Sequence, residues 1–256
     1  MPEVEREMSD DEKYFAVDAM NASTVKAGAT SMLYMFHIIS NPIKATPAMI
    51  LGTQRHCALL EPDRFEKLTR FDCSRRTKQY KAIAEEQGER NIISEKEYVD
   101  CIKAAEIARN HPAVVEMKLL EGGVAEKEFY WEEENGKAKA KLDYYVEDHF
   151  FVEYKTTQKL AGFIHTAARL HYDLGLGWYS RACGGLPGVF IVQESSAPYD
   201  VAVYEVQQYN MERWWTKCKA IWDKYLTGDR SGAYDTPIMF ELPSYADDDV
   251  LIELEG

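Results

Sequence analysis

The fold class follows from one stretch of the chain, KAKAKLDYYVEDHFFVEYKTT at residues 137–157, which combines two strand patterns with charges inside apolar flanks. Its halves are rich in aromatic and β-branched residues, and Glu147-Asp148 separates them as a turn, so the stretch predicts a β-hairpin. The hairpin carries Asp143 in one strand and both Glu153 and Lys155 in the other. Burying a charge without a partner costs several kcal/mol, so these three residues need an explanation.

Strand periodicity supplies part of that explanation. One face of the first strand is predicted to carry its charged residues, Lys137, Lys139, Lys141 and Asp143. Glu153 and Lys155 share a face of the neighbouring strand, so we expect the two carboxylates to converge with the lysine one step away. Such a group is a hard-oxygen site for Mg²⁺ or Mn²⁺, in which the lysine holds a water beside a phosphate. The spacing by itself also fits an ordinary surface ion pair.

The segments around the hairpin predict an α+β architecture. From Ser31 to Phe65 the pattern is helical, with an interruption at the prolines of SNPIKATP, and SEKE at residues 94–97 resembles a capping box before another helix. From Val124 three strand-like runs follow one another, then a helix over about 160–183, two further strands and a tryptophan-bearing helix. This order predicts a central mixed β-sheet flanked by helices, with an N-terminal helical elaboration.

At 256 residues the chain is expected to form a single domain. We expect four parts within it: a loosely ordered N-terminal segment 1–30, a helical part 31–123, an α+β core 124–245 and an acidic tail 246–256.

Composition indicates an ordinary globular protein. The chain is 46% hydrophobic, and no apolar run approaches the roughly 18 residues that a membrane span needs. The N-terminus lacks the apolar segment of a signal peptide, so we expect a cytoplasmic protein without membrane association. The five cysteines are scattered and odd in number, which predicts reduced thiols.

The formal net charge of −13 argues against a nucleic-acid partner, unless basic side chains gather locally. RRTKQYK at residues 75–81 is the one basic cluster outside the hairpin, and it includes Arg75, Arg76 and Lys78. These residues are candidates for DNA contact, although a solvated helix face explains them equally well.

Several segments together carry a family resemblance. They are TPAMILGTQRHCALLEPDRF at 46–65, RRTKQYKAIAEE at 75–86, AEKEFYW at 125–131, AKLDYYVEDHFFVEYKTTQ at 140–158 and FELPSY at 240–245. With them the chain resembles the PD-(D/E)-x-K nuclease superfamily, and within it the RecE-like exonucleases (exodeoxyribonuclease VIII type) of phages and prophages. The resemblance extends from about residue 30 to 245 and implies a restriction-endonuclease-like core.

The resemblance implies a role for each matching site residue. Asp143, Glu153 and Lys155 would be catalytic, and both acids would bind metal together with His56 and the backbone carbonyl of Tyr154. Two Mg²⁺ or Mn²⁺ ions per site are implied. Without the resemblance, His56 is better explained as a core histidine of an apolar helix.

Other positions are implied with less direct matches. Glu126 matches an upstream glutamate, an outer ligand or water acceptor, although a surface acid of an edge strand fits it nearly as well. Thr156 and Thr157 follow the lysine and either contact phosphate or end the strand.

The helix after the hairpin departs from the family. Tyr172 and Tyr179 are seven apart and share one helix face, as candidates for DNA contact or as core aromatics. The family's glutamine between them is Gly175 here, and with Gly177 it predicts a break or bend in the helix.

The activity implied is a Mg²⁺-dependent exodeoxyribonuclease that degrades linear double-stranded DNA from 5′ to 3′ and leaves a 3′ single strand for phage-type homologous recombination. A ring-shaped homo-oligomer (trimer or tetramer), a RecT-type annealing partner, and a phage or prophage gene expressed in a bacterial host are implied with it. A ring lined with basic side chains would reconcile the net charge with DNA. The alternatives are a structure-specific or restriction-type endonuclease on the same core, and a non-catalytic DNA-binding protein.

Overall fold

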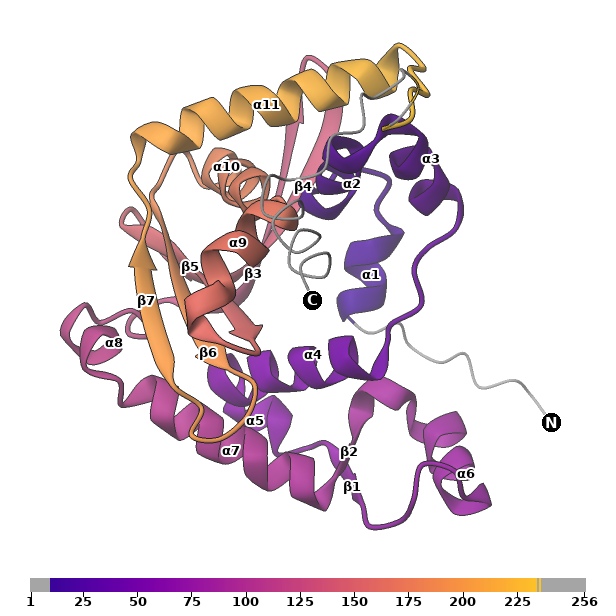
Figure 1. The fold of residues 1–256 in the computed structure, drawn as a ribbon, viewed down its shortest axis with the longest axis vertical. Coiled ribbons are helices and arrows are strands. Elements are labelled where there is room, and N and C mark those ends of the chain that lie inside the picture. The colour runs from indigo at the N-terminus through magenta and orange to yellow at the C-terminus, as the bar shows by residue number, and fades with distance from the viewer. Residues whose placement is uncertain (1–9, 234, 236–256) are drawn as a thin grey trace, which may run out of the picture.

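The computed structural model describes residues 10–233 and 235 (Figure 1). Residues 1–9, the segment FELPSY and the acidic tail 246–256 lie outside the described residues. None of the described helices combines the length and apolar character of a membrane span. The five cysteines are all free thiols, as the sequence predicts.

A five-stranded mixed sheet forms the centre of the fold, with its strands in the order β3-β4-β5-β6-β7. These strands are β3 (Val124–Glu133), β4 (Gly136–Val146), β5 (Phe150–Thr157), β6 (Gly188–Glu194) and β7 (Val201–Glu205). Only β5 and β6 pair in parallel, because the helical segment between them carries the chain back to the same end of the sheet. The predicted hairpin, the strand before it and the two later strands are thus confirmed.

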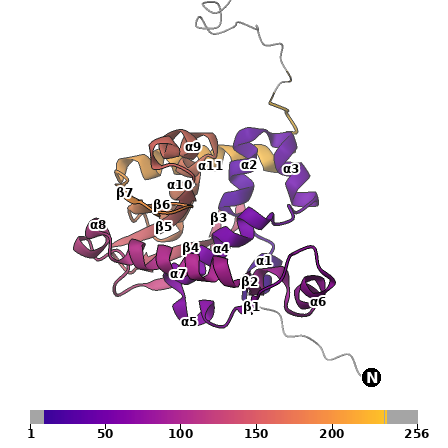
Figure 2. The ribbon, with the colours of Figure 1, turned by 60° about the horizontal axis from the view of Figure 1, so that its bottom comes forward.

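Helices cover both faces of this sheet (Figures 1 and 2). They are α1 (Asp10–Ala16), α2 (Ala22–Thr30), α3 (Met32–Ser40), α4 (Pro47–Leu60), α5 (Pro62–Phe65), α6 (Lys78–Gln87), α7 (Glu95–Arg109), α8 (Pro112–Glu116), α9 (Phe163–Arg169), α10 (Tyr172–Ala182) and α11 (Tyr209–Leu226). A short parallel pair, β1 (Thr69–Phe71) with β2 (Ile92–Ser94), and the 3-10 turns η1 (Glu89–Asn91) and η2 (Leu160–Gly162) complete the elements. The predicted α+β class is confirmed.

Two apolar cores lie on opposite faces of the sheet. One core joins α2, α10 and α11 to the sheet, with Trp178 fully buried at its centre. The other joins α4 and α7 to the sheet and buries Val152 and Tyr154 of β5. Because β5 contributes to both cores, burial fixes its register strongly.

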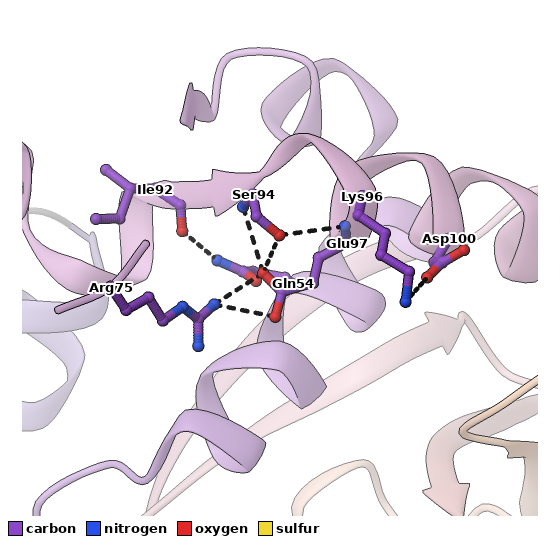
Figure 3. Close-up of polar contacts among 7 residues, drawn as sticks. All are labelled: Gln54, Arg75, Ile92, Ser94, Lys96, Glu97 and Asp100. Atoms are coloured by element: carbon purple, nitrogen blue, oxygen red, sulfur yellow. Dashed lines mark hydrogen bonds and ion pairs between the residues drawn. The ribbon is translucent and has the colours of Figure 1, made fainter. Parts of the chain in front are cut away.

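The predicted capping box at the start of α7 is present (Figure 3). The Ser94 hydroxyl accepts a hydrogen bond from the Glu97 backbone N–H, and the Glu97 carboxylate accepts one from the Ser94 N–H. Arg75 donates to both oxygens of this carboxylate, at 2.7 and 3.0 Å. The buried Gln54 amide ties α4 to the same region by donating to the Ile92 carbonyl.

The N-terminal segment differs from the expectation of loose order over residues 1–30. Helices α1 and α2 occupy most of residues 10–30, and Val25 is fully buried. Helix α2 is held by its packing in the core shared with α10 and α11, and the end of α1 is held by Lys139, only 2% exposed, whose Nζ donates to the carbonyls of Tyr14 at 2.8 Å and Val17 at 2.7 Å. A lysine at a helix C-terminus satisfies carbonyls that have no partner within the helix.

The segment predicted as one helix over about 160–183 also differs from the expectation. It is divided into η2, α9 and α10, and the chain turns at His171, where φ is +53°. Gly175 and Gly177 lie inside α10 without breaking it. A Cβ at Gly177 would meet the Trp214 Cβ and Trp215 N at 2.7 Å, so this glycine is required by the close approach of α11.

Replacing Lys139 by methionine is expected to lower the free energy of unfolding by about 2–3 kcal/mol, because carbonyls at the end of α1 would lose their donor. Hydrogen exchange should rise first over residues 10–20. Lys137→Met, on the exposed side chain two residues earlier in β4, is the matched control. Equal stability of the two variants would contradict the anchoring role of Lys139.

Gly177→Ala is expected to destabilise the protein by about 1–3 kcal/mol, since the added methyl group would overpack the contact between α10 and α11. Gly175→Ala is its control on the same helix, because a Cβ there meets no atom closer than 3.9 Å. That change should be neutral or stabilising by up to about 1 kcal/mol from helix propensity. Thermal unfolding of both variants tests the contrast, which would fail if they shifted alike.

Candidate metal centre

The pairing of β3 with β4 is distorted at Glu126 and Asp143. The pairs on either side of them keep one register, yet Glu126 adopts a left-handed conformation with φ at +51°. On β4, Leu142 packs in the core with α10, whereas Tyr144, two residues later, packs in the core with α4 and α7. The regular alternation predicted through Asp143 is therefore interrupted, because residues two apart in a regular strand share one face.

His56 on α4 reaches this distortion. Its Nδ1 lies 3.4 Å from Asp143 Oδ2, and its ring lies 4.9 Å from that of Tyr154 in an edge-on arrangement. One ligand atom each from His56, Glu126 and Asp143 lie within 4.8 Å of one another. An imidazole nitrogen and two carboxylate oxygens at this spacing can hold one divalent cation.

Hydrogen-bond donors of β5 hold the carboxylates of Asp143 and Glu153. Asp143 Oδ2 accepts a hydrogen bond from the Tyr154 backbone N–H at 2.8 Å. Glu153 is only 5% exposed, and its Oε1 accepts from Lys155 Nζ at 2.5 Å. Glu153 Oε2 is buried and has no hydrogen-bond partner among the described residues. A buried anionic oxygen without a donor fits a site that takes a cation.

Lys155 lies among the candidate ligand groups. Besides Glu153, its Nζ contacts the backbone carbonyl of Tyr154 at 3.3 Å. Burial lowers the pKa of Lys155, but the charges of Glu153 and Asp143 outweigh it and hold the pKa above its usual value. Lys155 is therefore a cation at neutral pH.

The pair of His56 and Asp143 favours the ionised carboxylate. Burial raises the pKa of Asp143, but His56, Lys155 and the Tyr154 N–H together lower it to about 2. Burial likewise lowers the pKa of His56, and Asp143 reverses the effect, so the net shift is upward. A cation at the site would compete with the proton of His56 for the same nitrogen.

The pKa values of the two other acids, Glu126 and Glu153, are raised, in contrast to that of Asp143. Burial, and then the charge of Asp143, raise the pKa of Glu126 to about 7, although Lys141 lies 3.3 Å from its Oε2. The same two causes raise the pKa of Glu153. Acids pushed apart in pKa within one cluster are typical of functional sites, since like charges at short range cannot all ionise without a counter-charge.

Helix α10 brings both expected tyrosines to this region. Lys155 Nζ lies 5.6 Å from the centroid of the Tyr172 ring. Burial, followed by the charges of Glu153 and Asp143, raises the pKa of Tyr179 well above its usual value. Both rings also pack against phenylalanines of the core, Phe163 and Phe151 respectively.

Other candidates are placed elsewhere. Arg75 and Arg76 lie in the turn before α6, and Lys78 is the first residue of α6, in the segment between β1 and β2. Arg75 is occupied by Glu97. Thr157 accepts the Ser195 N–H at its carbonyl and donates its hydroxyl to the Lys159 carbonyl. These bonds favour the strand-ending alternative for Thr157.

Sequence reasoning missed Lys26 of α2, whose Nζ lies 5.7 Å from the centroid of the Tyr172 ring. Burial, and then the charge of Lys155, lower its pKa, whereas Glu153 and Asp143 raise it. Its segment was expected to be loosely ordered, so no signal in the sequence indicated it.

Comparisons with known proteins identify the family and the fold of the chain. A family model described as a PDDEXK-like domain of unknown function (DUF3799) matches residues 26–228. A structure from Eubacterium rectale, named as a candidate exonuclease, is 14% identical with a TM-score of 0.61, over 94% of this chain and 98% of that one. The alkaline exonuclease LHK-Exo from Laribacter hongkongensis is 14% identical with a TM-score of 0.42, over 82% and 89% of the two chains. No protein with a curated description matches. The first structure is similar in fold, and the overlap with the second is too low to bear on it.

The variant Glu126→Gln is expected to have opposite effects on the stability of the metal-free protein and on its stabilisation by Mn²⁺. Because the pKa of Glu126 is raised from 4.5 to about 7, the metal-free fold loses stability as pH rises through that window. At pH 8 the glutamine variant should therefore be more stable than wild type by about 1–2 kcal/mol, while Mn²⁺ should raise its unfolding temperature less.

Glu132→Gln, an exposed position of the same strand, is the matched control and should change neither quantity. Thermal unfolding with and without Mn²⁺ provides both measurements. A full Mn²⁺ effect in Glu126→Gln would show that Glu126 is not a ligand.

Proposed function

Because the chain belongs to the family of PDDEXK-like domains described as DUF3799, we propose that it is a divalent-metal-dependent nuclease that hydrolyses phosphodiester bonds of DNA. The family confirms the superfamily expected from the hairpin and from the helix that carries His56. One observation supports the activity above all others: ligand atoms of His56, Glu126 and Asp143 converge beside the Glu153–Lys155 pair.

The donor set fits Mg²⁺ or Mn²⁺. Oxygens of Glu126, Asp143 and Glu153 with one imidazole of His56 are ligands of the kind that small hard divalent ions accept. A bound ion of this type supplies an activated water and stabilises charge on the phosphoryl group. The unpartnered oxygen of Glu153 supports a cation next to that carboxylate as well, and hence room for the two ions that the resemblance implies.

Asp143 and Lys155 have different roles beside the bound ion. Asp143 stays ionised, and its Tyr154 N–H and His56 contacts hold it in one orientation. Lys155 stays protonated, and its Nζ can donate to a phosphate oxygen or hold a water in place of its contact with Glu153. Positioning and charge stabilisation of this kind carry most of the catalysis of phosphoryl transfer.

The finer assignment rests on the sequence resemblance to RecE-like exonucleases. We infer that linear DNA ends are the substrate, that digestion runs 5′ to 3′, and that the remaining 3′ strand serves recombination with a RecT-type partner. A ring-shaped homo-oligomer, cytoplasmic and encoded by a phage or prophage, is part of the same proposal. The gathering of Lys26, Lys141 and Lys155 near the acids supports a local attraction for phosphate in a chain of net charge −13.

Lys155→Ala and His56→Ala are each expected to reduce the cleavage rate by about 10²–10³-fold, because each removes a group that binds or stabilises charge at the reacting phosphate. The measurement is digestion of end-labelled linear duplex with Mg²⁺ or Mn²⁺, and EDTA should abolish it. Lys137→Ala, an exposed lysine of the same hairpin, should cleave at the wild-type rate.

Covalently closed circles distinguish the alternatives. An exonuclease leaves them intact, whereas equal cutting of circles and linear duplex would establish the endonuclease. If the wild-type chain cleaves neither and Asp143→Ala binds DNA as well as wild type, the non-catalytic DNA-binding protein is correct.

A further inference from the structure

Lys26 of α2 lies against α10, where Gly175 and Tyr172 are its neighbours. It is partly buried, and its neighbours Val25 and Ala27 belong to the core shared with α10 and α11. Its Nζ lies 5.7 Å from the centroid of the Tyr172 ring, the same ring that Lys155 approaches at 5.6 Å. Two lysines from distant parts of the chain thus share one aromatic neighbour beside the acids.

Gly175 leaves the space that Lys26 occupies. A Cβ at Gly175 would find both Cδ and Nζ of Lys26 at 3.9 Å, with Tyr179 Cε2 at the same distance. Any side chain longer than alanine at position 175 would enter the volume of the lysine. The absence of a side chain on α10 and the presence of a long cationic one on α2 are therefore complementary.

The charges around Lys26 do not explain it as a simple ion pair. The charges that shift the pKa of Lys26 are the like charge of Lys155 and the opposite charges of Glu153 and Asp143. Glu153 already accepts from Lys155, and Asp143 from the Tyr154 N–H, so both acids have donors of their own. Two lysines beside one aromatic ring repel each other less when an anion binds near both of them.

We propose that Lys26 contacts a phosphate of the bound DNA strand at the metal centre, and that Gly175 is the residue that makes room for it. The proposal rests on the nuclease function and deepens it: the phosphate is contacted from two sides, by Lys155 of β5 and by Lys26 of α2. An ammonium group suits this role because it acts as a compact charge on a flexible stem and needs no fixed bidentate geometry.

A structural counter-charge for the buried acids is the competing explanation, and the salt dependence of DNA binding separates the two. A lysine that contacts phosphate displaces about one counterion, so its loss lowers the slope of log affinity against log salt by about one. A lysine that only balances the acids leaves this slope unchanged and alters metal affinity.

Lys26→Met is the decisive variant, because it keeps the apolar stem that packs against Gly175 and Tyr172. Binding of labelled duplex, with Ca²⁺ in place of Mg²⁺, should weaken about tenfold with the slope reduced by about one. Mn²⁺ affinity should remain within about twofold of wild type, and the cleavage rate should fall about 10²-fold. Lys96→Met removes an exposed lysine of α7 and should behave as wild type.

Combining Gly175→Gln with Lys26→Ala tests the shared space, because alanine at position 26, unlike methionine, leaves that space empty. A glutamine from α10 would enter the volume vacated by the lysine and return a neutral donor, so part of the DNA affinity should recover while the salt slope stays reduced. No recovery of affinity would overturn the claim that the two positions serve one contact.

Loss of Mn²⁺ affinity with an unchanged salt slope would overturn the proposal and make Lys26 a structural counter-charge. If Lys26→Met has the wild-type salt slope of DNA binding and the wild-type cleavage rate, the proposal is likewise overturned. A wild-type chain that binds DNA with the Lys26-dependent slope, yet cleaves none with Mg²⁺ or Mn²⁺, would refute the nuclease function and retain the phosphate contact.

Discussion

The main constraint on the structure is the repulsion among three carboxylates, which the surrounding structure must compensate. They belong to Glu126, Asp143 and Glu153, and the sheet brings them together in partly or fully buried positions. Water screens such charges poorly at this depth, so each acid needs a donor, a proton or a cation. Asp143 has the Tyr154 N–H and His56, Glu153 has Lys155, and Glu126 has Lys141. One oxygen of Glu153 has no hydrogen-bond partner among the described residues, which supports the proposed cation at this carboxylate.

The backbone accommodates this cluster by giving up regular strand geometry at one point. Glu126 adopts positive φ without inserting a residue, and β4 changes from one core to the other at Asp143. Strain of this kind in a non-glycine residue costs on the order of 1–3 kcal/mol and persists only where the surroundings impose it. Here two well-packed cores lie on either side, and they hold the acids together.

The lysines of KAKAKLD illustrate how tertiary contacts assign different roles to one repeated residue. Lys137 is exposed, Lys139 is buried as the anchor of α1, and Lys141 lies against Glu126. Strand periodicity placed them on one face but could not distinguish them, because their partners come from segments more than a hundred residues away or from the neighbouring strand. Lys139 holds the end of α1, and the packing of Val25 and Ala27 in the core shared with α10 and α11 holds α2.

The sequence alone was enough to predict the α+β class, the hairpin and the capping box of α7, because strand periodicity and cap chemistry act over a few residues. The superfamily was predicted from the resemblance of several segments to a known family, and it is confirmed. Motif spacing also singled out Asp143, Glu153 and Lys155, and the family resemblance added His56. Tertiary structure alone decided that Glu126 joins His56 and Asp143, that Arg75 serves a helix cap, and that Lys26 faces Gly175. These outcomes depend on which distant elements pack together, and local pattern carries no information about that.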